Sequence, residues 1–124
     1  GGLTLGRVGA PEQASGHQVT VASMLDLAGL KVAVIQERAL GKDYLDVAAL
    51  LQAGIKLSDA LGAAGALYGQ MFNPMITLKA LNYFADGDLP KLPNDVKQFL
   101  SEQASQVESI PTIQRLSDQI AAEP

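Results

Sequence analysis

Apolar and polar positions follow two different patterns along this 124-residue chain. Residues 3–8 and 18–22 alternate apolar residues with others and contain β-branched types, and a loop rich in Pro, Gly and Ser separates them. This pattern predicts an N-terminal β-hairpin. Because a two-stranded hairpin is only marginally stable in water, it needs a sheet, a helix or another chain to pack against.

Helical patterns begin at Ser23. Ser23, with Asp26 three residues later, is typical of a capping box. Residues 24–35 are then apolar on nearly every face, which predicts a buried central helix. Gly41 is expected to end this helix, and a second helix is expected over residues 42–53.

Further helices are expected to begin at N-cap or proline signals in the second half of the chain. The expected starts are Ser58 (running to about Tyr68), Asn73-Pro74 (to about Ala85), Asn94 and Pro111. The sequence therefore predicts a mainly α fold, a small helical bundle with an N-terminal β-hairpin. We expect three parts: the hairpin over 1–22, the bundle over 23–93 and peripheral C-terminal helices over 94–124.

The amino-acid composition argues against several classes of function. The chain has no cysteine, which excludes disulfides, thiolate metal sites and cysteine nucleophiles. The net charge of −4 comes without a basic stripe, so nothing indicates binding to a polyanion. No signal peptide is recognisable, and the most apolar stretch, residues 19–35, contains Asp26 and Lys31. We therefore expect a cytoplasmic protein with no membrane partner. Its first residue is Gly1, so we expect a chain processed or cut from something longer.

Lys31 does not fit the apolar pattern around it. It is the only charge within residues 27–35, and a buried ammonium needs a partner or a polar cleft. Asp26 lies five residues earlier, roughly 140° around the helix, so the two do not stack. Asp43 and Asp46 share one face of the next helix and are the candidate partners. Two interpretations stay open, a structural salt-bridge cluster and a cleft in which Lys31 meets an anionic ligand.

Other polar signals are weaker. Asp86-Gly87-Asp88 spells D-x-D, a pattern that can hold magnesium, but it is expected to form a turn after a helix. His17 is expected at the surface and Tyr83-Phe84 in the core. The sequence contains no phosphate-cradling glycine loop and none of the common hydrolase motifs.

Two stretches, "SMLDLAGLKVAVIQERALGKDYLDVAALLQAGIKLSDAL" and "FNPMITLKALNYFADGDLPKLP", resemble the nucleotidyltransferase AbiEii/AbiGii toxin family. The resemblance covers residues 1 to about 93. It rests on Asp26-x-x-x-x-Lys31, then on Arg38 and Lys42-Asp43-x-x-Asp46, which correspond to the third and fourth motifs of the family. The first motif, Gly-Ser followed by D-x-D on a sheet, is missing from this sequence. The resemblance therefore implies the C-terminal part of such an enzyme.

The resemblance also implies an activity, nucleotidyl transfer from a nucleoside triphosphate to tRNA or to a protein hydroxyl. Mg²⁺ and the triphosphate are the cofactors expected for the complete enzyme, and none is expected on this chain alone. Lys31 would face the phosphates, and Asp43 would act at the reaction centre by activating the acceptor or orienting Lys31. The residues expected to bind or position these groups are Asp26, Arg38, Lys42 and Asp46.

An alternative from another class is a non-catalytic helical interaction module. The missing D-x-D strand and the unsupported hairpin favour it. Such a chain is expected to self-associate through the hairpin edge, giving a homo-oligomer, or to bind a partner such as an antitoxin. In either case we expect this chain alone to show no nucleotidyl transfer and only weak triphosphate binding.

Overall fold

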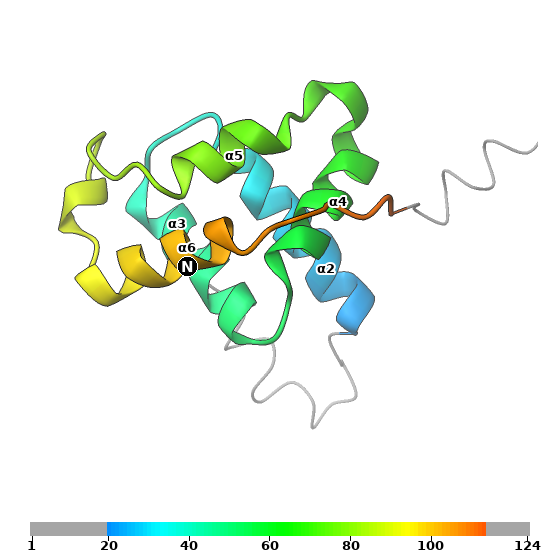
Figure 1. Ribbon diagram of the computed structural model, residues 1–124, viewed down its shortest axis with the longest axis horizontal. Coiled ribbons are helices and arrows are strands. Elements are labelled where there is room, and N and C mark those ends of the chain that lie inside the picture. The colour runs from blue at the N-terminus through cyan, green and yellow to red at the C-terminus, as the bar shows by residue number, and fades with distance from the viewer. Residues whose placement is uncertain (1–19, 114–124) are drawn as a thin grey trace, which may run out of the picture.

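The computed structural model describes residues 20–113. Within them the chain forms five α-helices and two short 3-10 helices and contains no strand (Figure 1). The elements are α2 (Val21–Val34), α3 (Gly41–Gln52), α4 (Leu57–Tyr68), η2 (Gly69–Met71), α5 (Pro74–Ala80), η3 (Leu89–Lys91) and α6 (Asn94–Ser105). The prediction of a mainly helical fold is confirmed for this part of the chain.

Helices α2 and α4 form the most extensive packing contact, and α3 packs against both α2 and α6. Small residues allow the close approach of α2 to α4. A Cβ placed on Gly29 would lie 2.9 Å from the backbone nitrogen of Ala64 and 3.0 Å from the Cβ of Ala63. Gly29 is therefore required where the two helices meet.

The apolar core lies between α2, α3, α4 and α6. Its fully buried large side chains are Val32, Val47, Leu50, Leu61, Leu81, Leu89 and Leu100. No single helix within residues 20–113 has the length and apolar character to cross a membrane, although the bent pair 41–52 and 57–71 meets that test by length and composition.

Helix α5 is tied to the end of α2 by polar contacts. The Thr77 hydroxyl donates to the carbonyl of Val32 at 2.7 Å and accepts from the Gln36 amide at 3.0 Å. The same amide donates to the carbonyl of Asn73 at 2.6 Å. Because Thr77 is fully buried, these bonds satisfy groups that water cannot reach. They hold the α2–α3 turn beside α5.

The start of α2 differs from the predicted one. Thr20 is the N-cap, and its hydroxyl accepts a hydrogen bond from the backbone amide of Ser23 at 3.0 Å. The predicted capping box at Ser23 and Asp26 is therefore wrong, because Thr20 already satisfies that amide. The predicted second strand, 18–22, is also wrong at its end, since residues 21–22 form the first turn of α2. The rest of the hairpin, and His17, lie outside the described residues.

Gly41 begins a helix and does not end one. Helix α2 ends at Val34, and Gly41 is the first residue of α3. The first amides of a helix have no partner inside it, and the Gly41 amide donates instead to the Asp88 carboxylate at 2.7 Å. A contact from a distant loop therefore fixes this boundary, which explains why local sequence signals missed it.

Later boundaries agree more closely with the predictions. Asn73 caps α5, as predicted, by accepting from the amide of Met75 at 3.0 Å. Helix α4 begins one residue before the predicted cap at Ser58. Helix α5 ends at Ala80, five residues earlier than expected. Asn94 is the first residue of α6 and not its cap.

The expected C-terminal helix is tested only at its start. Residues 111–113 are not helical, and the remainder lies outside the described residues.

We predict that Gly29→Ala destabilises the fold and that Gly65→Ala stabilises it. An added methyl at position 29 must displace α4 backbone, which typically costs about 1–3 kcal/mol. No atom lies within 4 Å of a Cβ at Gly65, so no steric clash offsets the gain in helix propensity of about 0.5–1 kcal/mol. Urea unfolding of both variants checks this. Equal effects at the two positions would show that α2 and α4 are not in close contact.

Candidate functional site

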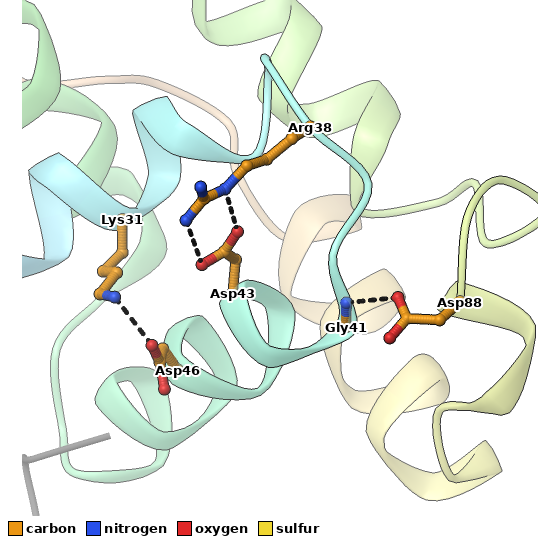
Figure 2. Close-up of polar contacts among 6 residues, drawn as sticks. All are labelled: Lys31, Arg38, Gly41, Asp43, Asp46 and Asp88. Carbon is orange, nitrogen blue, oxygen red and sulfur yellow. Dashed lines mark hydrogen bonds and ion pairs between the residues drawn. The ribbon is translucent and has the colours of Figure 1, made fainter. Parts of the chain in front are cut away.

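Two ion pairs connect α2 and the turn that follows it to α3 (Figure 2). In the first, Lys31 Nζ on α2 lies 2.8 Å from Asp46 Oδ2 on α3. The Asp46 carboxylate is buried, whereas the Lys31 side chain keeps 23% of its surface exposed. Of the two candidate partners, Asp46 is the carboxylate that contacts Lys31.

The second pair lies one helical turn earlier on α3. Arg38 Nε donates to Asp43 Oδ2 at 2.7 Å, and a terminal guanidinium nitrogen donates to Oδ1 at 3.2 Å. Asp43 is only 1% exposed, whereas the Arg38 side chain is 51% exposed. The hydrogen bond and the charge of Asp43 raise the pKa of Arg38 above its ordinary value. Two of the five guanidinium N–H donors are used, so three remain for other partners.

The sequence places both carboxylates on the face of α3 that meets α2. Their i, i+3 spacing sets their common face, and Asp43 also lies in the first turn, where the helix dipole favours an anion. A buried carboxylate needs a cation or several hydrogen bonds to remain charged. The partners come from two sources, Lys31 from the body of α2 and Arg38 from the turn after it.

The D-x-D segment supports this turn from the other side. Asp88 caps α3 through Gly41, and Gly87 has a φ of 55°, which favours glycine. A Cβ at Gly87 would overlap the carbonyl oxygen of Ala39, so the two loops are in direct contact. The predicted turn is confirmed, and it packs against the residue that follows Arg38.

The remaining predicted site residues do not join the pairs. Asp26 and Lys42 are both exposed, and neither forms an ion pair within residues 20–113. Nor does this part of the chain contain a group of three His, Cys, Asp or Glu side chains that could hold a metal ion. Asp43 and Asp46 are each already engaged by a cation. The described residues therefore do not fit a Mg²⁺ site.

A pocket of about 260 Å³ lies beside Arg38. Its walls come from the end of α2 and the following turn, from α3, from α5 and from the loop after α5. The lining residues are Ile35, Gln36, Glu37, Arg38, Ala39, Tyr44, Ile76, Ala80, Tyr83, Asp86 and Leu89. The sequence singled out only Arg38 of this set as a site residue.

Tyr83 was expected in the core, but it is 55% exposed and borders this pocket. Tyr83 follows Ile76 and Lys79 at helical spacing, and both of these residues are exposed. Phe84 follows the buried Thr77 and Leu81 at the same kind of spacing; it is half-buried and packs edge-on against Tyr44, with ring centroids 6.2 Å apart. The spacing along α5 therefore distinguishes the two aromatic residues, and the prediction that treated them together was wrong for Tyr83.

The Tyr44 ring forms part of the pocket wall. The residue is 2% exposed, and its hydroxyl has no hydrogen-bond partner within residues 20–113. Burial raises the pKa of the Tyr44 phenol, and the negative charges of Asp86 and Asp43 raise it further. The phenol therefore stays neutral and can donate a hydrogen bond across the physiological range.

The family model described as "Nucleotidyl transferase AbiEii toxin, Type IV TA system" matches residues 6–120. No curated protein and no solved structure matches the chain significantly.

We predict that Lys31→Met destabilises the fold and that adding Asp46→Leu restores much of the loss. The single change leaves a buried carboxylate unpaired, which costs about 3–5 kcal/mol in a fully buried pair and about 1–3 kcal/mol here because Lys31 is partly solvated. Urea unfolding gives the free energy of unfolding of Lys31→Met, of Asp46→Leu and of the double variant, which together form a double-mutant cycle. An unchanged or raised stability of Lys31→Met would contradict a structural role and favour the ligand-site interpretation.

We also predict that Tyr44→Phe protects the fold at high pH. A phenol whose pKa is raised on folding contributes stability that is present below about pH 10, its unfolded pKa, and lost as pH rises through the folded pKa. Thermal midpoints from pH 8 to pH 11.5 should therefore fall less for the variant than for the wild type. Tyr68→Phe, at an exposed tyrosine outside this pocket, is the control and should follow the wild type. Parallel curves for all three proteins would contradict the assignment.

Proposed function

Because the chain belongs to the AbiEii nucleotidyltransferase toxin family, we propose that its two ion pairs form the part of the active site that binds the phosphates of a nucleoside triphosphate. Lys31 and Arg38 supply the positive charges, and Asp46 and Asp43 hold them in place. The reaction is nucleotidyl transfer to an acceptor hydroxyl, on tRNA or on a protein.

The contact that carries this proposal is the one between Arg38 and Asp43. The two hydrogen bonds fix the plane of the guanidinium, while half of the side chain surface stays open and three N–H donors remain unused. A cation held in position before the ligand arrives binds phosphate without paying the full entropy of ordering a long side chain. Lys31 is anchored in the same way by Asp46 and is also partly exposed.

The spacing of the two carboxylates along α3 is the reason for proposing that the two cations act as one binding surface. Asp43 and Asp46 are neighbours on α3, with Cβ atoms about 5–6 Å apart at this spacing. Figure 2 shows Lys31 and Arg38 reaching from the α2 segment to these two carboxylates. In this proposal a polyphosphate lies along this line and contacts both cations.

Each carboxylate receives a separate role in this proposal. Asp46 orients Lys31, a role the sequence had offered to Asp43. Asp43 keeps Arg38 in place through its Oδ2 atom, and when the longer contact at Oδ1 (3.2 Å) opens, that oxygen accepts the proton of the acceptor hydroxyl. The hydroxyl oxygen then bonds to the α-phosphorus while the bond to pyrophosphate breaks. Asp26 and Lys42, both exposed, are proposed to position substrate at the outer edge.

We place the Mg²⁺ of the reaction outside residues 20–113, because these residues do not fit a metal site. Because the sequence also lacks the Gly-Ser and D-x-D motif of the family, we expect no transfer by this chain alone. The setting we propose is the cytoplasm, where triphosphates and tRNA are available. The family is described as belonging to a type IV toxin–antitoxin system, and this supports an antitoxin as the partner we propose.

We predict that the chain binds ATP or CTP weakly and that Arg38→Gln and Lys31→Gln each weaken binding by about tenfold or more. A hydrogen bond to a charged group contributes about 1.5–3 kcal/mol, which corresponds to that factor. Lys56→Gln removes an exposed lysine on the α3–α4 connection and is the matched control. Equilibrium binding of labelled triphosphate to folded variants is the measurement. If Lys56→Gln weakens binding as much as the other two changes do, the phosphate site is not at the ion pairs.

A second candidate function is the helical interaction module. The observation that favours it is a group of exposed apolar side chains where η2 meets α5. Met71 is 90% exposed, and Met75 and Ile76 follow it on the surface. Methionine-rich surfaces adapt to varied partners. Sizing the purified chain at increasing concentration, with Met71→Ser/Met75→Ser as comparison, tests self-association through this surface.

A further inference from the structure

The pocket beside Arg38 has the size of a site for one ring system. Its volume of about 260 Å³ lies just below the range of roughly 300–1,000 Å³ that is typical of pockets for whole small molecules. Arg38, which the proposed function assigns to phosphate, is one of its lining residues. A ligand that reaches both features would place a compact group in the pocket and an anionic group on Arg38.

The pocket carries aromatic surface that nothing in the fold uses. Tyr83 lines the pocket, and 55% of the residue's surface is exposed. Ile76 and Ala80 of α5 add apolar wall. A planar ligand stacked on an aromatic side chain gains about 1–3 kcal/mol per base in single-stranded nucleic-acid complexes. The exposed Tyr83 ring is therefore suited to a flat heterocycle.

The pocket also presents hydrogen-bonding groups of both kinds. Glu37 and Asp86 are acceptors only, Arg38 retains three N–H donors, and the buried Tyr44 hydroxyl has no partner among the described residues. An unpaired polar group in a pocket wall is a position for a ligand to satisfy. Asp86 and Tyr44 both line the pocket, so the Asp86 carboxylate is available at the pocket wall.

The hydrogen-bond donors and acceptors of the pocket favour some classes of ligand over others. A lysine or arginine side chain of a partner protein offers donors only and would leave the donors of Arg38 unused. A nucleobase edge offers donors and acceptors together on a flat ring. Cytosine, adenine and guanine carry an exocyclic amino donor, whereas uracil has a carbonyl acceptor in the place of the cytosine amino group. A carboxylate facing that position accepts from an amino group and repels a carbonyl.

We propose that this pocket binds a nucleobase that carries an exocyclic amino group and discriminates against uracil. Tyr83 stacks on the base, and Asp86 accepts a hydrogen bond from its amino group. The inference rests on the proposed function only for the phosphate bound at Arg38, because the base contacts involve other residues. The base belongs either to the triphosphate or to the terminal nucleotide of an RNA acceptor.

The test uses the full chain and saturation-transfer NMR titrations with cytidine and uridine, which carry no phosphate. We expect cytidine to bind about tenfold or more tightly than uridine, since one amino-to-carboxylate bond is lost and a repulsion appears. Tyr83→Ala should weaken cytidine binding by about tenfold or more, and Tyr68→Ala, at an exposed tyrosine of α4 outside the pocket, should not. Asp86→Asn should bring the cytidine-to-uridine ratio to within about twofold, because an amide both donates and accepts.

Two further binding measurements, with triphosphates and with short RNAs, distinguish the two possible sources of the base. If CTP binds more tightly than UTP by the factor found for the nucleosides, the pocket holds the base of the triphosphate. If CTP and UTP bind equally while a short RNA ending in cytidine binds more tightly than one ending in uridine, it holds the base of the acceptor. Either result supports the proposal.

Several results would overturn it: equal binding of cytidine and uridine, no binding of either, no effect of Tyr83→Ala, or tighter binding of N-acetyl-lysine amide than of cytidine. Failure of the proposed function has a different signature. In that case CTP binds no more tightly than cytidine and Lys31→Gln has no effect, while the base preference and its dependence on Tyr83 persist.

Discussion

Two buried carboxylates on α3 determine how this part of the chain is arranged. Asp43 and Asp46 lie on the face of α3 that packs against α2, where a charge without a partner is strongly unfavourable. Lys31 from α2 and Arg38 from the following turn provide the partners. The same contacts fix the position of α3 relative to α2 and immobilise two cations that remain partly open to solvent. The same four side chains therefore satisfy a structural requirement of the core and, in the function we propose, form a pre-arranged site for anions.

Much of this arrangement follows from short-range sequence patterns. Helical periodicity located the helices, and the Asn73-Pro74 signal gave the start of α5 correctly. Lys31 stood out because it was the only charge in an apolar run. The i, i+3 spacing of Asp43 and Asp46 placed both carboxylates on one face. These inferences succeeded because each depends on residues within one or two helical turns.

The rest depends on contacts between distant segments. Which cation pairs with which carboxylate is decided by the path of the α2–α3 turn, and that path is set by Gly87 and Asp88, more than forty residues later. The start of α3 at Gly41 has the same cause. The pocket forms where this turn meets α5 and the loop after it, so no pattern within a single helix predicts it.

The most direct test of the central claim is ¹⁵N-detected NMR of the arginine Nε and lysine Nζ groups during titration with pyrophosphate. The account predicts that the Arg38 and Lys31 resonances shift together along one binding curve, because both cations exchange part of their carboxylate contact for phosphate. The resonance of Lys56, which is exposed and outside the pairs, should stay in place. Unchanged Arg38 and Lys31 signals at concentrations where other basic groups respond would contradict the claim that the ion pairs are an anion site.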